Sequence, residues 1–135
     1  MDPHVSFQAL VIGVGNYLYY TDLLDTLADA QTFYDLLINP KRCGYAPNRV
    51  RLRKGKDATR ENILDDLTWL ARNATPEATT LVYFSGHGGY IENGSSYLCP
   101  HEADWRNLAG SAISAQMFSQ AIEAIHTQRL VVILD

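Results

Sequence analysis

The sequence has little of several features that would assign a chain to a particular class. It has only two cysteines, Cys43 and Cys99, and they lack the paired spacing of a zinc site, so neither a disulfide framework nor a zinc domain is expected. Charged residues make up 19% and the formal net charge is −4, which predicts no general attraction to nucleic acid or anionic lipid. The apolar stretch at 9–14 is too short to span a membrane, and the first four residues contain no basic signal region. We therefore expect no nucleic-acid or membrane partner and a cytoplasmic location.

The order of apolar segments predicts one α/β domain. With 135 residues and 47% hydrophobic residues, the chain is long enough for a single core. Hydrophobic periodicity, caps and turn residues predict the following elements: a buried strand and its turn at 7–15, a short one-sided or edge strand at 49–53, buried strands at 81–84 and 130–134, helices at 23–38, 59–70 and from 114 through 125, and a hairpin at 89–98 turning at Asn93-Gly94. Strands that alternate with helices favour a parallel sheet covered on both faces.

Polar residues gather where these strands end. In open parallel sheets the carboxyl ends of the strands lie at one edge, and ligands bind there. The expected topology brings three groups to this edge: the segment 16–25 after the first strand, the segment 85–89 after the third, and Asp135 after the fourth. The sequence thus predicts a functional site formed by these segments.

The segment Phe84-Ser85-Gly86-His87-Gly88 contains the strongest candidate for a catalytic side chain. An apolar strand stops at a histidine between glycines, and those glycines let the backbone turn so that the imidazole can face a cleft. The alternative is a histidine in a glycine-rich surface turn. A histidine base also needs a nucleophile to activate, and this segment contains no cysteine.

Three segments resemble the catalytic domain of caspase-like cysteine peptidases, in particular bacterial metacaspases (orthocaspases). They are the 84–88 motif, Ala28-Asp29-Ala30 in the first helix, and the strand with its final aspartate at 130–135. The resemblance covers nearly the whole chain and implies a caspase-like three-layer sandwich, a mainly parallel sheet flanked by helices. Caspases place the nucleophilic cysteine about 50 residues after the histidine, which falls just beyond Asp135. Residues 1–135 are therefore expected to be the large-subunit portion of the catalytic domain, without the nucleophile.

The resemblance also implies roles for individual residues. His87 would be the base of a Cys-His dyad, and the backbone N–H of Gly88 would form part of the oxyanion hole. Asp29 and Asp135 match the carboxylates that bind the basic P1 side chain, and such a pair suits Arg or Lys better than Asp. The expected activity is therefore cysteine-type endopeptidase cleavage after Arg or Lys. The expected partners are peptides or proteins with a basic P1 residue and a small-subunit chain or C-terminal continuation.

Other polar residues are weaker candidates. Neither Cys43 nor Cys99 has the position of the nucleophile, and both are expected to be packing or surface thiols. Family members often need Ca²⁺, but Glu102 and Asp104 alone are too few for an ion that takes six to eight oxygens, so calcium is left open and no metal ligand is assigned.

Two alternatives to an active peptidase remain at this stage. The first is a truncated or catalytically dead metacaspase homologue that binds peptides or partners. The second is a non-proteolytic α/β module in which the Gly-His-Gly sequence is a coincidence. The coding sequence past Asp135 separates the enzyme from the first alternative, because an in-frame cysteine followed by histidine supports the enzyme and a stop codon excludes it for this product.

Overall fold

A four-stranded parallel sheet forms the centre of the molecule. The structure, a computed structural model, describes residues 7–90 and 94–135. The strands β1 (Phe7–Gly13), β2 (Val50–Lys54), β3 (Thr79–Ser85) and β7 (Arg129–Leu134) have the order β2-β1-β3-β7. β1 is buried throughout after its first residue, and β2 is an edge strand, as the pattern predicted. β7 forms the second edge, where the side chains from Val131 to Leu134 are 36–57% exposed.

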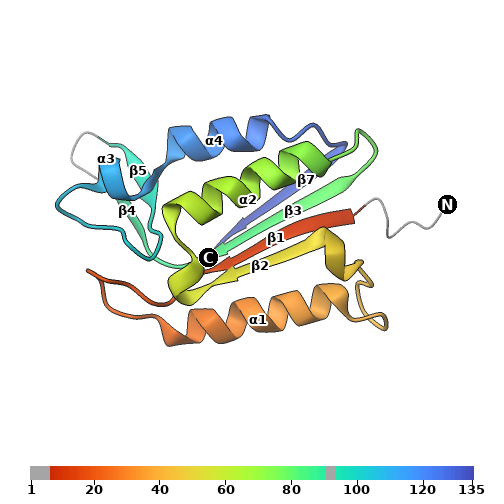
Figure 1. The fold of residues 1–135 in the computed structure, drawn as a ribbon, viewed down its shortest axis with the longest axis horizontal. Helices are drawn as coiled ribbons and strands as arrows, with labels where there is room; N and C mark the ends of the chain where they lie inside the picture. Colours follow the sequence, from red (N-terminus) through yellow and green to blue (C-terminus); the bar gives the residue numbers. More distant parts are fainter. Residues whose placement is uncertain (1–6, 91–93) are drawn as a thin grey trace.

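Helices cover both faces of this sheet. Figure 1 shows α1 (Leu24–Ile38) on one side and α2 (Arg60–Asn73) with α4 (Ala115–Glu123) on the other. Thr59 caps α2 by accepting the Asn62 N–H at 3.2 Å, and Ser114 caps α4 by accepting the Met117 N–H at 3.1 Å. Both helix starts are confirmed. None of the helices in the described residues has the length and apolar character needed to cross a bilayer.

Two hydrophobic clusters hold the three layers together. One lies between the sheet and α1 and includes Ala9, Val11 and Tyr83, and the other lies under α2 and α4 and includes Leu10, Ile12 and Phe84. Neighbouring residues of β1 and β3 thus point to opposite faces, as the twofold repeat of a strand requires. The expected three-layer α/β fold is confirmed.

A small antiparallel sheet stands beyond the carboxyl ends of the long strands (Figure 1). β4 (Gly88–Tyr90) pairs with β5 (Ser96–Leu98), which confirms the hairpin, and β6 (Ile113–Ser114) joins β5 as a third strand. Asn93 of the expected turn lies outside the described residues. The sequence did not predict β6 or the helix α3 (Leu108–Ser111), and two short 3₁₀ segments, η2 (Pro47–Arg49) and η3 (Gly55–Asp57), flank β2.

A buried carboxylate links α2 to the edge strand β2. Asp66 is fully buried and accepts hydrogen bonds from Arg53 Nε at 2.7 Å and Nη2 at 2.8 Å, and from Arg51 Nη1 at 3.1 Å. The Arg51 guanidinium also lies 4.3 Å from the centre of the Trp69 ring. Three charge-assisted bonds therefore offset the desolvation of this one carboxylate.

We expect Asp66→Asn to lower the free energy of unfolding by about 2–3 kcal/mol. Breaking a fully buried ion pair costs about 3–5 kcal/mol, and the effect is smaller here because both arginines are partly exposed and can turn to water. Urea denaturation measures the change. The exposed neighbour Asp65 supplies the matched control, since Asp65→Asn should stay within about 0.5 kcal/mol of the parent. Equal stabilities of the two variants would contradict this role of Asp66.

Candidate active site

The imidazole of His87 is held by a backbone carbonyl at the carboxyl edge of the sheet. His87 lies two residues after the end of β3, and its Nε2 lies 2.8 Å from the carbonyl oxygen of Thr21, in the segment after β1. A carbonyl oxygen can only accept a hydrogen bond, so Nε2 must carry the proton. In the neutral ring this leaves the lone pair on Nδ1, which is then the atom able to take a proton from a nucleophile.

The backbone of the histidine turn is fixed by Tyr17. The His87 N–H donates to Tyr17 Oη at 2.7 Å, and the two rings lie 4.7 Å apart. Burial raises the pKa of Tyr17 to about 12, so the hydroxyl stays neutral across the working range of enzymes. On the other side, the His87 carbonyl accepts the Cys99 N–H at 3.0 Å. Both peptide groups of His87 are therefore anchored, independently of its side chain.

A glycine before the histidine is required by the same tyrosine. A Cβ added at Gly86 would lie 2.6 Å from Tyr17 Oη, closer than Cβ atoms approach other atoms, and 3.3 Å from Val14 Cβ, which is a tight contact. The ring of Tyr20 also lies next to the imidazole, and the centres of the two rings are 5.5 Å apart. The glycine thus allows the turn to lie against Tyr17.

Asp135 lies beside this turn. Its N–H donates to the Phe84 carbonyl at 2.8 Å, and its carbonyl accepts the Gly86 N–H at 3.2 Å, so the β3–β7 pairing continues past the last strand residue. One more step of that register places Asp135 beside Ser85, on the face of the sheet that α1 covers.

Asp29 and Asp135 both contribute to the raised pKa of Tyr83. Asp29 is exposed on α1, and Tyr83 lies between α1 and the sheet, where it stacks on Phe33 with ring centres 4.6 Å apart. Burial is the main cause of the raised pKa of Tyr83, and the negative charges of Asp135 and Asp29 raise it further, while a hydrogen bond with Ser85 opposes them. Two carboxylates from distant parts of the chain therefore contribute to the electrostatic environment of the same phenol.

Gly88 is exposed and begins β4 immediately after His87. The three segments expected at the carboxyl edge are thus adjacent in the structure: the loop after β1 contacts His87, and Asp135 bonds to Gly86. The oxyanion-hole role of Gly88, the base role of His87 and the P1 roles of Asp29 and Asp135 stay predictions.

The two thiols have surroundings that do not suit a nucleophile. Cys99 is fully buried, and burial raises the pKa of its thiol, with a weaker opposing hydrogen bond from Tyr20. Because the thiolate is the reactive form, this environment keeps Cys99 unreactive at neutral pH. Cys43 is a half-buried free thiol after α1 and packs against the cluster on that side of the sheet, which includes Leu37.

The carboxylates considered for calcium are engaged in other contacts. Glu102 accepts the Arg60 N–H at the start of α2, at 3.0 and 3.3 Å, and Asp104 forms an ion pair with Arg106 at 2.9 Å. Within residues 7–90 and 94–135, no group of three or more His, Cys, Asp and Glu side chains is arranged to hold a metal ion. Both carboxylates therefore already have partners within the protein.

Two contributors to the site were missed by the sequence reasoning. Thr21 acts through its backbone carbonyl, so its residue type carries no signal. Tyr17 was missed because its contact with His87 joins residues 70 positions apart and depends on the pairing of β1 with β3.

The molecule is therefore an α/β protein with a parallel sheet, and its candidate site contains an imidazole held in place at the carboxyl edge of that sheet. Residues 7–135 match the family model described as the caspase domain, so the chain belongs to the caspase domain family of peptidases. The match includes the Gly-His-Gly sequence, so a coincidental origin of that motif is disfavoured.

The chain is also similar to individual proteins in sequence or structure. The chain is 32% identical over 92 residues to "Metacaspase-1" of Eremothecium gossypii and 30% identical over 92 residues to "Metacaspase-1" of Schizosaccharomyces pombe, with 64% of this chain covered in each case. The matched part covers 20% and 21% of those proteins, so the chain spans about a fifth of their length. The crystal structure of protein GSU0716 from Geobacter sulfurreducens superposes on 96% of this chain and 48% of its own, with a TM-score of 0.67 and 18% identity. That structure supports the fold alone.

Proposed function

We propose that the polypeptide to which this chain belongs is a cysteine endopeptidase that cleaves after Arg or Lys. Membership of the caspase domain family supports the peptidase class. The observation that carries the proposal is the 2.8 Å contact between His87 Nε2 and the Thr21 carbonyl, because it leaves Nδ1 available as a base at the sheet edge. The nucleophilic cysteine would be supplied by residues that follow Asp135 or by a separate small-subunit chain.

The proposed chemistry begins with proton transfer from the cysteine thiol to Nδ1 of His87. The thiolate attacks the scissile carbonyl carbon, and the oxygen of that carbonyl gains a negative charge that the N–H of Gly88 would stabilise. When the C–N bond breaks, the amine leaves with the proton held by the imidazolium, and the acyl group stays on sulfur. Water then hydrolyses the thioester after the imidazole removes one of its protons.

Asp29 and Asp135 are the proposed basis of specificity. Their shared influence on Tyr83 supports a location on one side of the sheet edge, next to the turn that precedes His87. Two carboxylates in such a position would attract a guanidinium or ammonium group and repel an aspartate. The expected order of substrates is therefore Arg and Lys at P1 before Asp.

A P1 series of peptidyl-aminomethylcoumarin substrates tests this function on a polypeptide extended past Asp135. We expect turnover with Arg and Lys, and none with Asp. Asp29→Asn should lower kcat/KM for the Arg substrate by about tenfold, because the P1 guanidinium would lose one charge-assisted contact at an exposed position. Asp35→Asn, which changes another exposed acidic residue near the far end of the same helix, is the matched control and should leave kcat/KM unchanged. Preference for Asp at P1 would refute the specificity.

The two thiols favour a second candidate for residues 1–135 acting alone. With Cys99 buried and Cys43 packed after α1, this segment by itself would be a peptide- or partner-binding module, as in a catalytically dead homologue. The coding sequence beyond Asp135 distinguishes the two, since a stop codon there would leave only binding.

A further inference from the structure

An exposed aromatic surface lies next to the candidate site. Outside β7, five large hydrophobic side chains of the described residues are exposed, and three of them, Leu18 (60%), Tyr19 (47%) and Trp105 (65%), belong to two loops that are hydrogen-bonded to each other. Single exposed hydrophobic residues are ordinary, but several on two adjoining loops are a candidate interaction surface. We call Leu18, Tyr19, Trp105 and Arg106 the aromatic platform.

The platform is ordered by Arg106. Its guanidinium carbon lies 5.0 Å from the centre of the Tyr19 ring and 5.9 Å from that of Trp105. The carboxylate of Asp104 accepts bonds from Arg106 Nε and Nη2, both at 2.9 Å. The charge of the guanidinium is therefore paired, and what the platform offers a ligand is mainly flat aromatic and aliphatic surface.

The two loops of the platform are tied to each other and to the histidine. The Leu18 N–H donates to the His101 carbonyl at 3.1 Å, and His101 Nδ1 lies 2.8 Å from the Asn16 carbonyl oxygen. Tyr20 and Thr21, which directly follow Tyr19, contact the imidazole.

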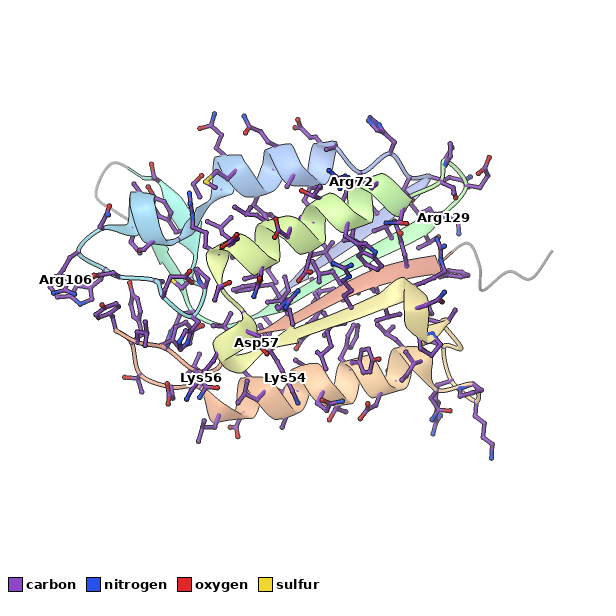
Figure 2. The ribbon with its side chains drawn as sticks, in the orientation of Figure 1. Lys54, Lys56, Asp57, Arg72, Arg106 and Arg129 are labelled. Carbon is purple, nitrogen blue, oxygen red and sulfur yellow. The ribbon has the colours of Figure 1, made fainter. Side chains whose placement is uncertain are left out.

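The platform therefore includes Tyr19, which lies one residue before the first of the two residues that contact the imidazole. Figure 2 shows Arg106 at the end of the molecule where β1 and β3 finish. An extended peptide advances about 3.3 Å per residue, so a substrate lying across His87 would reach this surface within a few positions.

We propose that the aromatic platform is a substrate subsite that binds an aromatic or large aliphatic side chain of the peptide, at a position other than P1. This inference rests on the proposed peptidase function and adds a second specificity element to it. A surface made of Trp, Tyr and Arg has the composition of binding hot spots. An acidic ligand is disfavoured because Asp104 already pairs with Arg106.

Intrinsic fluorescence tests the subsite without requiring turnover. The chain contains two tryptophans, so Trp69→Phe leaves Trp105 as the only reporter. Peptides that share Arg at P1 and carry either Phe or Ala at one position from P4 to P3′ are titrated into this variant of the 135-residue chain. At one of these positions we expect Phe to change the Trp105 emission and to bind about tenfold more tightly than Ala, as burial of one aromatic side chain implies.

Variants and controls separate the platform from general effects. In the parent chain, Trp105→Ala and Tyr19→Ala should each remove most of the Phe-over-Ala preference, measured by calorimetry. Leu36→Ala changes an exposed hydrophobic residue on α1 and should keep the preference. Circular dichroism confirms folding of each variant.

Each outcome bears on the proposal. Equal affinity for Phe and Ala at every position would overturn the proposal. A change in Trp105 emission with protein concentration, in the absence of peptide, would also overturn it, because it would show that a second copy of the chain covers the platform. If the extended polypeptide has no peptidase activity but this chain still prefers Phe, the peptidase function fails and the subsite stands. Turnover without any preference for Phe overturns the subsite alone.

Discussion

Replacing His87 by alanine is expected to lower kcat/KM for an Arg-P1 substrate by about 10³-fold or more in a polypeptide extended past Asp135. General acid–base catalysis contributes about 10²–10⁴-fold, and here one ring would serve both the attack and the departure of the amine. The backbone of the turn is held by Tyr17 and Cys99 through the peptide groups of His87, which alanine retains. The loss should therefore fall on catalysis and leave the fold intact.

His126 provides the matched control for this experiment. It is exposed in the segment between α4 and β7, before β7 begins, so it lies away from the carboxyl edge. His126→Ala should keep the parent activity, and both variants should melt within a few degrees of the parent. Turnover by His87→Ala close to that of the parent would remove His87 from the mechanism.

Gly86→Ala is expected to lower activity by about 10–100-fold and stability by about 1–3 kcal/mol, the usual cost of overpacking. The new Cβ would lie 2.6 Å from Tyr17 Oη, so the ring or the turn must move, and the 2.7 Å bond that fixes the His87 N–H would be strained or lost. Kinetics and urea denaturation measure the two effects.

A double-mutant cycle tests whether Tyr17 is the cause. Tyr17→Phe removes the hydroxyl that the Cβ would meet, so Gly86→Ala should cost less in the Tyr17→Phe background than in the parent. Gly89→Ala is the matched control, because a Cβ there meets its nearest atoms at 3.6 and 3.8 Å, an ordinary contact distance. Equal costs of Gly86→Ala in both backgrounds would show that Tyr17 does not require the glycine.

The main architecture was predictable because the elements have strong local patterns. The apolar runs of β1 and β3 and the capping residues Thr59 and Ser114 mark strands and helix starts without reference to the rest of the chain. Parallel pairing then places the carboxyl ends of the strands together, and this brings His87 and Asp135 to the same edge of the sheet.

The parts that could not be predicted depend on tertiary contacts. The two-residue strand β6 and the four-residue helix α3 are too short to have a periodicity of their own. The Thr21 carbonyl reaches His87 only because the loop after β1 folds over the end of β3. The platform likewise depends on the pairing of Leu18 with His101, residues that are far apart in the sequence.

The central claim is that His87 activates a cysteine that is neither Cys43 nor Cys99. Its most direct test is to label the extended polypeptide with a peptidyl-arginine chloromethyl ketone and to find the alkylated residue by mass spectrometry. The account predicts one label on a cysteine that follows Asp135, and loss of that label in His87→Ala. Labelling of Cys43 or Cys99, or labelling that does not depend on His87, would contradict it.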